Sequence, residues 1–303
     1  MIIAITGGTG FIGKLLAERH LKMGDQVKIL SRNHTILHHD IQLFIGDLAN
    51  PEVDLSEFIA NTDILYHCAG EVQHEALMQE LHVNGTQRLV DEAQGKVARL
   101  VQLSSVGAYG PYREGLINEK LVENPLGIYE ITKTESDNII KNSGIPYVIL
   151  RPSNVFGESM TNQSLFQLLK MVRQGLFFYI GKKDSMINYI HVSEVVEALL
   201  KCGSKANALG NVFIISQSTT VQKMVESFLK GLNINRIFLR FPECIVRVIS
   251  IGFSIIPKAP LTTSRIDALT GKCVYDSSKI ENDLNFKFSI TLEESFKLFA
   301  KQK

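Results

Sequence analysis

The sequence lacks a surplus of charge of either sign. Its 303 residues include 32 lysines and arginines against 31 aspartates and glutamates, a formal net charge of +1. A chain so balanced has no overall field that would attract nucleic acid or an anionic membrane. We therefore expect no nucleic-acid partner, and any recognition of phosphate must be local.

Cysteine is also scarce. The four cysteines lie far apart without a CxxC pair, at Cys68, Cys202, Cys244 and Cys273. This spacing matches neither a zinc site nor a disulfide framework. The sequence therefore predicts reduced, buried thiols and no metal site.

A leader and a long apolar run are missing too. The opening residues MIIAITGG carry no basic leader and no cleavage site, so we expect a cytoplasmic protein. The most apolar late stretch, Cys244–Ile256, is interrupted by Arg247 and is shorter than the roughly twenty apolar residues of a spanning helix. We predict no transmembrane segment. The stretch is interpreted as a core or substrate-cap helix, with a membrane-surface helix as the alternative.

What the chain does contain is a series of short apolar strands that alternate with helical patterns. The strand patterns are Ile2–Ile5, Val27–Leu30, Gln42–Ile45, Ile64–His67, Leu100–Leu103 and Tyr147–Leu150, and the helical ones include Phe11–Met23, Glu75–Ala93 and Tyr129–Lys141. Such alternation predicts a parallel sheet covered on both faces. The predicted class is α/β, a Rossmann-type doubly wound parallel sheet.

The pattern becomes less regular after Pro152. The later segments are a loop at Gly157–Thr161, helices at Leu165–Arg173, Val195–Leu200, Val221–Leu229 and Leu292–Phe299, and a strand at Val212–Ile215. We predict a dinucleotide-binding domain at 1–155 and a smaller substrate-binding part at 156–303. Some later segments are expected to return to the first sheet.

Three glycines follow the first strand with the spacing GxxGxxG. Gly7 permits a tight turn, Gly10 lets the backbone approach a pyrophosphate, and Gly13 lets the helix pack closely on the strand. The N-terminus of that helix attracts phosphates. The position directly after a first strand is the context that a dinucleotide-binding motif requires.

Small and acidic residues follow the next strands. Asp47 could accept a hydrogen bond from an adenine amine, or could simply be a surface turn residue. Ala69 and Gly70 end a strand with little side chain, as is needed where backbone lies against a cofactor. We interpret the neighbouring His67 as a core histidine with satisfied hydrogen bonds.

The end of the second strand bears on the choice of coenzyme. NAD-dependent enzymes usually place an acid there to bind the ribose hydroxyls, but this chain has Ser31 and Arg32. A guanidinium can bind the 2′-phosphate of NADP in a bidentate manner. The sequence therefore favours NADP(H), with NAD(H) as the other possibility.

Tyr129 and Lys133 are four residues apart, which places both on one face of a helix. A nearby ammonium and a positive nicotinamide ring would favour the tyrosinate, so Tyr129 could exchange a proton near neutral pH. Ser105 ends a strand and could hydrogen-bond the same substrate oxygen. We predict that these three residues form a catalytic set.

The ordered motifs of this chain resemble the extended short-chain dehydrogenase/reductase family, also called the NAD-dependent epimerase/dehydratase family. The matching segments are 6–13 (TGGTGFIG), 46–48 (GDL), 67–70 (HCAG), 83–86 (VNGT), 104–110 (SSVGAYG), Tyr129 with Lys133, and 151–157 (RPSNVFG). Two later segments, 188–192 and 276–286, are similar to the family's substrate half.

The resemblance implies further roles. It places at the cofactor Phe11 and Ile12 (pyrophosphate), Leu48 and Ala69 (adenosine), Asn84, Ser104, Pro152 and Ser153. Asn154 matches a position that often meets a nucleotide-sugar substrate. Many relatives carry an arginine where this chain has Ile187, so Arg265 or Lys272 could bind the substrate pyrophosphate instead.

The resemblance also leaves several reactions open. Members that dehydrate sugars carry an Asp-Glu pair where this chain has Val106 and Gly107, so we do not expect dehydration. We predict a 4-keto reductase or 4-epimerase of a nucleotide-diphosphate sugar. The alternatives are an NADPH-dependent reductase of a hydrophobic ketone and a non-catalytic NADP(H)-binding scaffold. Relatives pair through helices equivalent to Glu75–Ala93 and Tyr129–Lys141, which implies a homodimer.

Overall fold

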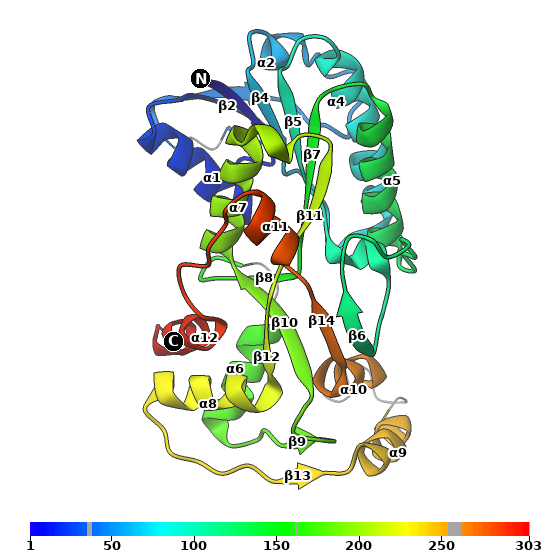
Figure 1. Cartoon of the computed structure of the whole chain (residues 1–303), viewed down its shortest axis with the longest axis vertical. Helices are drawn as coiled ribbons and strands as arrows, with labels where there is room; N and C mark the ends of the chain where they lie inside the picture. The colour runs from blue at the N-terminus through cyan, green and yellow to red at the C-terminus, as the bar shows by residue number, and fades with distance from the viewer. Residues whose placement is uncertain (35–37, 161–162, 254–261, 303) are drawn as a thin grey trace.

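A seven-stranded parallel sheet forms the upper half of the molecule (Figure 1). The computed structural model describes residues 1–34, 38–160, 163–253 and 262–302. The strand order is β11-β7-β5-β4-β1-β2-β3. The strands are β1 (Ile2–Thr6), β2 (Gln26–Ser31), β3 (Ile41–Ile45), β4 (Ile64–His67), β5 (Arg99–Leu103), β7 (Tyr147–Pro152) and β11 (Asn211–Ile215). The order reverses between β1 and β4, as in a Rossmann fold, and confirms the predicted class.

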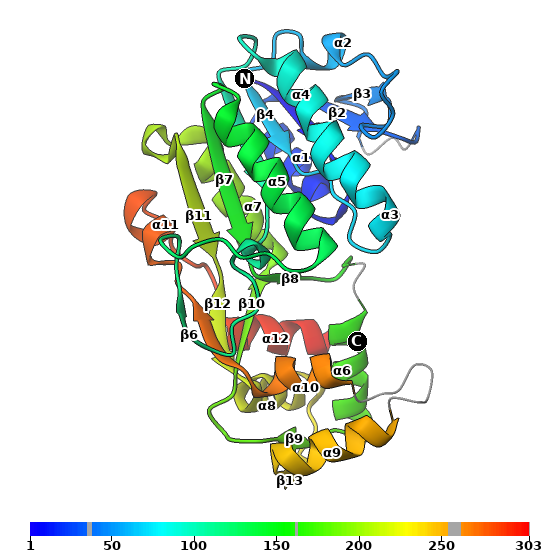
Figure 2. The same cartoon turned by 90° about the vertical axis from the view of Figure 1, so that its right-hand side faces the viewer.

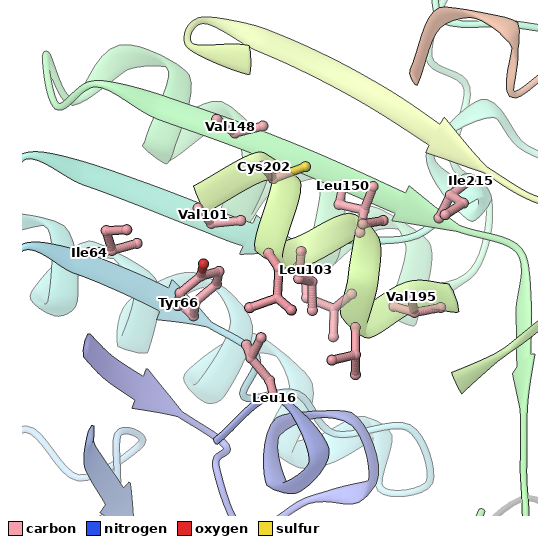
Figure 3. Close-up of a cluster of buried hydrophobic side chains, with 14 of the residues drawn as sticks. Leu16, Ile64, Tyr66, Val101, Leu103, Val148, Leu150, Val195, Cys202 and Ile215 are labelled. Atoms are coloured by element: carbon pink, nitrogen blue, oxygen red, sulfur yellow. The ribbon is translucent and has the colours of Figure 1, made fainter. Parts of the chain in front are cut away.

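Helices cover both faces of this sheet, as the alternating patterns predicted. One face carries α1 (Phe11–Lys22), α7 (Val192–Ser204) and α11 (Ser278–Asp283), and the other carries α2 (Ser56–Ile59), α4 (Gly85–Ala93) and α5 (Ile128–Asn142). Side chains alternate between the faces with the period of two that strands impose. Val101 and Leu103 of β5 thus belong to the same cluster as Val195 of α7 on one face (Figure 3), whereas Leu100 belongs to the cluster on the other.

The lower half is built from short strands. Its pairings are β8 (Asn154–Phe156) with β10 (Met186–His191) and β12 (Gln217–Thr220), β6 (Glu114–Ile117) with β14 (Lys272–Tyr275), and β9 (Tyr179–Ile180) with β13 (Arg240–Phe241). The helices are α6 (Ser164–Gln174), α8 (Val221–Leu232), α9 (Glu243–Phe253), α10 (Thr263–Thr270) and α12 (Leu292–Lys301). Both views place β9, β13 and α9 at the lower end of the molecule, far from β1 (Figures 1 and 2).

β11 crosses the predicted domain boundary. It pairs in parallel with β7, from Asn211 beside Val148 to Ile215 beside Pro152. A segment that follows residue 155 by more than fifty positions therefore completes the first sheet. The division at residue 155 itself stays a prediction.

The predicted helix at Glu75–Ala93 is interrupted. It consists of α3 (Glu75–Met78), a π-helix (Gln79–Asn84) and α4. The π-helix contains His82, whose ring is hydrogen-bonded to Glu71 and Thr132. Such π-turns inside helices frequently mark functional sites. Two short 3-10 helices also occur, at Val106–Tyr109 and Ala206–Ala208.

The prediction of buried thiols is wrong for one cysteine. All four cysteines are free, Cys202 is buried and Cys68 and Cys273 are partly buried, but Cys244 is exposed. Cys244 lies on the exposed side of α9, the helix predicted at Cys244–Ile256. Residues 254–256 of that prediction lie outside the described residues, as does Thr161 of the predicted loop. Among the described residues, no helix has the length and apolar character needed to cross a membrane.

Candidate active site

The loop after β1 brings the start of α1 to the carboxyl edge of the sheet. α1 begins at Phe11, and its N-cap residue Gly10 makes no side-chain capping bond. The first turn contains no acidic residue. The uncapped N–H groups and the helix dipole attract an anion to this end of the helix, although the net charge of the chain is only +1.

Steric contacts explain why this loop needs glycine. Gly7 has a φ of +68°, and a Cβ there would lie 2.7 Å from the backbone nitrogen of Ala69 at the end of β4. A Cβ on Gly13 would overlap the Gly7 carbonyl oxygen, and Gly10 N donates to that oxygen at 2.9 Å. The backbones of β1, β4 and α1 therefore lie against one another. Together with the uncapped helix end, this arrangement fits a dinucleotide pyrophosphate.

Two side chains of this region point into the protein. Phe11 packs against the lower apolar cluster and Ile12 against the cluster under the sheet. Both side chains are partly buried, so their backbone N–H groups are the polar groups that they offer for the pyrophosphate role implied by the resemblance.

The residues predicted at the adenosine side follow β3 and β4. Asp47 uses one carboxylate oxygen to accept the Ala49 N–H at 2.9 Å, an Asx turn. Leu48 is buried in the core, so its backbone rather than its side chain borders this edge of the sheet. Ala69 is partly buried and Gly70 is exposed, as a backbone surface for a cofactor requires.

A histidine and an asparagine complete this side. His67 is buried and uses both ring nitrogens, at 2.6 Å to Thr6 and 2.9 Å to Thr86, which confirms its interpretation as a satisfied core histidine. Asn84 is exposed on the π-helix, and its amide donates to Glu80 at 2.6 Å.

Ser31 and Arg32 end β2 as predicted, but they differ in environment. The Ser31 hydroxyl is buried and bonded to the backbone of Asn33. Arg32 is exposed at the edge of the sheet. Of the two, Arg32 is the group that can reach a phosphate on the adenosine ribose.

The structure brings Ser105, Tyr129 and Lys133 together. Ser105 follows β5 and caps the 3-10 helix, accepting the Gly107 N–H at 3.1 Å. Tyr129 and Lys133 lie on the first turns of α5, and Ser105 is near enough to the Tyr129 phenol to lower its pKa. Lys133 is buried, and its ammonium donates to the Leu103 carbonyl at 2.8 Å, two residues before Ser105.

The Tyr129 phenol is protonated in this state. Burial, together with the carboxylates of Glu130 and Asp137, raises its pKa to about 12, and the nearby Ser105 hydroxyl opposes this rise. Burial lowers the pKa of Lys133 against the opposing charge of Asp137. The sequence predicted that Lys133 and the positive nicotinamide ring together would favour the tyrosinate. In the protein alone burial prevails, and the effect of the bound ring stays a prediction.

A buried ionic cluster lies under this set, and the sequence did not predict it. Asp137 accepts from Ser104 at 2.7 Å and from Arg151 at 2.8 Å. Arg151 also binds Glu123 at 2.7 Å, which in turn pairs with Lys141 at 3.0 Å. The Ser104 hydroxyl thus faces Asp137 rather than the cofactor that the resemblance implied. Asp137 follows Lys133 by four residues, and that spacing was the available signal.

His82 is a second site residue that sequence reasoning missed. Its Nε2 accepts the Glu71 N–H at 2.8 Å and its Nδ1 lies 2.8 Å from the Thr132 hydroxyl. Its ring meets Tyr129 edge-on, with centroids 5.7 Å apart. Burial lowers the pKa of His82 to about 4, so the ring is neutral and holds the loop after β4 against α5.

The remaining predicted residues are more scattered. Pro152 ends β7, and the buried Ser153 hydroxyl accepts from Ser216 at 2.8 Å. Asn154 is exposed on β8 and donates to the Asn188 carbonyl at 3.2 Å. Arg265 lies on α10 in the lower half and donates to Gln167 at 3.3 Å, while Lys272 pairs with Asp184 at 2.6 Å (Figure 2).

The fold and the glycine loop define a dinucleotide-binding α/β protein. Residues 3–216 match the model of the NAD dependent epimerase/dehydratase family, and the chain belongs to that family. It is an NAD-dependent enzyme of the extended short-chain dehydrogenase/reductase type.

Individual relatives are distant but cover most of the chain. It is 25% identical to a UDP-glucose 4-epimerase of Vibrio cholerae, over 98% of this chain and 94% of the relative. It is 26% identical to a 4-hydroxy-2-methyl-3-oxo-4-farnesyl-3,4-dihydroquinoline-1-oxide ketoreductase of Stigmatella aurantiaca, over 74% and 70%. The crystal structure of a UDP-glucuronic acid 4-epimerase from Bacillus cereus in complex with NAD has a similar fold, with a TM-score of 0.77 at 20% identity, covering 99% and 96%.

Proposed function

We propose that the chain acts on a nucleotide-diphosphate sugar, as a 4-epimerase or a 4-keto reductase with Tyr129 as its acid–base group. The observation that carries the proposal is that Ser105 lies close enough to the Tyr129 phenol to lower its pKa, beside the buried Lys133. The epimerases among the relatives and similar structures support the nucleotide-sugar class.

The proton chemistry follows from the state of Tyr129. With its pKa raised to about 12, the phenol holds its proton at neutral pH and can donate it to a carbonyl oxygen that is being reduced. Ser105 donates a second hydrogen bond to that oxygen. The Lys133 ammonium stabilises the phenolate that remains, and in the reverse direction the phenolate takes the proton back. When bound, the nicotinamide supplies or accepts the hydride.

The substrate is held by groups around this set. We assign Asn154 to the sugar side because it is exposed at the start of β8, two residues after the end of β7. Arg265 supplies the positive charge for the substrate diphosphate from α10. Both roles stand as proposals.

We propose NADP(H) as the preferred coenzyme, with NAD(H) as the other possibility. The support is the exposed Arg32 at the end of β2, where an acid would select NAD. A guanidinium at this place can make two charge-assisted hydrogen bonds to a dianionic 2′-phosphate, whereas a neutral 2′-hydroxyl offers it a single weaker acceptor.

The test is an assay with UDP-glucose and UDP-galactose in the presence of NAD⁺ or NADP⁺, followed by proton NMR of the anomeric signals. Interconversion without net change of coenzyme identifies an epimerase. Oxidation of NADPH by a 4-keto sugar nucleotide identifies a reductase. Stabilisation in a thermal-shift screen by steroid-like ketones alone, with no effect of nucleotide sugars, would overturn the proposal.

A reductase of a hydrophobic ketone is the second candidate. The similarity to a ketoreductase whose named substrate carries a farnesyl chain favours it, as does the apolar outer face of α9. A non-catalytic NADP(H)-binding scaffold is the third, and the Ser105, Tyr129 and Lys133 set argues against it, since a scaffold needs no acid.

We also propose a homodimer formed by α4 and α5. The outer faces of these helices border a shallow hollow of about 570 Å³, lined by Gln87, Asp91, Glu135 and Asn138 among others. Light scattering tests this, and a monomeric mass at micromolar concentration would contradict it.

A further inference from the structure

α9 is attached to the protein by its polar side. Glu243 and Arg247 are hydrogen-bonded to each other at 2.8 Å. Arg113 binds Glu243 at 2.9 Å and Asp267 at 3.0 Å, and Arg247 also pairs with Asp267. Among residues 243–250 of α9, whose side chains the structure describes, Val246 is the one buried apolar residue, and it packs with Ile180 and Ile266. Over these residues the order is the reverse of an ordinary surface helix, whose apolar face packs inward.

The apolar side of α9 faces outward instead. Ile245, Val248 and Ile249 share one face with the spacing i, i+3 and i+4, and their exposed fractions are 50%, 71% and 48%. Four further apolar residues of the same end of the molecule are exposed: Leu176 (63%), Ile237 (92%), Leu239 (71%) and Phe241 (40%). We call these seven residues the lower apolar surface.

β9, β13 and α9 carry this surface or adjoin it, and they lie together in both views (Figures 1 and 2). Scattered single exposed apolar residues are ordinary, but a group of large ones at one end of a molecule marks an interaction site. We therefore expect a binding partner to cover the lower apolar surface.

The charges around the lower apolar surface are mostly positive. Residues 175–184 and 236–249 contribute the cations Lys182, Lys183, Arg236, Arg240 and Arg247, and the acids Asp184 and Glu243. Both acids are already paired, Asp184 with Lys272 and Glu243 with Arg113 and Arg247. Arg240 donates to the carbonyls of Gly181 and Lys182 and stacks on Tyr179, which are neutral groups. A local positive field thus remains in a chain of net charge +1.

A pocket of about 800 Å³ opens at the rim of this surface. Phe241 and Cys244 line it together with four cations and two acids, Arg113, Lys182, Arg240, Lys272, Glu114 and Glu243. Its size and its cations suit an anionic headgroup next to an apolar plane.

We propose that the lower apolar surface docks the protein on an anionic phospholipid membrane. α9 lies parallel to the membrane with Ile245, Val248 and Ile249 among the acyl chains, and Lys182 and Lys183 contact the headgroups. This is the geometry of an interfacial amphipathic helix, in which burial of apolar area and attraction to anionic lipid add together. The proposal does not depend on which substrate the enzyme uses.

A second copy of the chain is a less suitable occupant. Self-association through this end would bring two positive surfaces into contact, and like charges oppose each other across an interface. An anionic lipid surface meets both the apolar side chains and the cations.

The test is co-sedimentation of the full chain with vesicles of phosphatidylcholine alone and of an equal mixture with phosphatidylglycerol. We expect the protein to pellet with the mixed vesicles only, and to be released by high salt. The double variant Val248→Ser/Ile249→Ser should stay in the supernatant. Lys182→Ala/Lys183→Ala should lower binding about tenfold or more, because each lysine near an anionic surface contributes to affinity.

Val122→Ser is the matched control, because Val122 is 83% exposed but lies outside the lower apolar surface. It should pellet like the unaltered protein, and all variants should keep their melting temperature. Failure of the unaltered protein to pellet, or equal pelleting of Val248→Ser/Ile249→Ser, would overturn the proposal. If the unaltered protein does not bind vesicles and the double variant has a lower molar mass than it, the surface joins two copies of the chain. That result would also overturn the proposal.

Discussion

On both faces of the seven-stranded sheet, apolar side chains pack under the covering helices, and the ion pair of Asp137 and Arg151 is buried near the catalytic set. On α9 the arrangement is reversed, since charges attach the helix and apolar side chains face out. The sheet is thus stabilised by the fold itself. The outer face of α9 instead leaves apolar side chains exposed, which is the feature on which the proposed membrane contact depends.

Removing the buried carboxylate should have the largest effect on stability. Asp137→Ala leaves Arg151 and Ser104 buried without their partner, and breaking a buried ion pair costs about 3–5 kcal/mol. Asp267→Ala removes the half-exposed partner of Arg113 and Arg247 and should cost about 1 kcal/mol or less. Urea denaturation measures the free energy of unfolding of both variants. Equal losses would contradict the contrast between the buried ion pair of the sheet and the exposed pairs of α9.

Gly7→Ala should have the next largest effect. The left-handed backbone and the overlap with Ala69 together should cost about 2–4 kcal/mol and weaken coenzyme binding. Gly24→Ala is the matched control, because Gly24 has a φ of +83° but open space around it. It should lose only about 1–2 kcal/mol for its backbone and bind coenzyme normally. Similar coenzyme affinity in both variants would contradict the role of the glycine loop.

Arg32→Ala should change coenzyme preference without changing stability. Loss of charge-assisted hydrogen bonds to the 2′-phosphate should weaken NADPH about tenfold, while NADH is little affected. Fluorescence titration with each coenzyme measures the two dissociation constants. Equal losses for both would remove the argument for NADP(H).

Substitution on the outer face of α9 should have the smallest effect on folding. Val248→Ser should change the free energy of unfolding by less than about 0.5 kcal/mol. Val246→Ser, on the inner face two residues earlier, should cost about 2 kcal/mol because its side chain is buried. A large loss in Val248→Ser would mean that the outer face is packed in the folded protein.

The same contrast explains what could be predicted from the sequence. The strands of the upper sheet are short apolar runs that can be recognised from neighbouring residues alone. β1, β2, β4, β5 and β7 therefore lie where these runs predict them. The lower strands were not predicted. β9 and β13 are two residues long, and they pair across about sixty positions, which no local pattern encodes.

The site divides in a similar way. Gly7, Tyr129 and Lys133 were found because a turn, or a spacing within one helix, defines each of them. Asp137 and His82 matter through contacts with other elements, namely Arg151 on β7 and the backbone after β4, and these become visible only when the chain is folded. The pKa of Tyr129 depends on burial, which spacing alone could not give.

The most direct test of the central claim compares Tyr129→Phe with Tyr112→Phe, a change at an exposed tyrosine. Turnover of the substrate found in the nucleotide-sugar assay, and the dissociation constant of the coenzyme, are measured for both. If Tyr129 is the acid–base group, its variant loses about 10²–10⁴-fold in turnover while coenzyme affinity stays within about twofold. Full turnover in Tyr129→Phe would contradict the account.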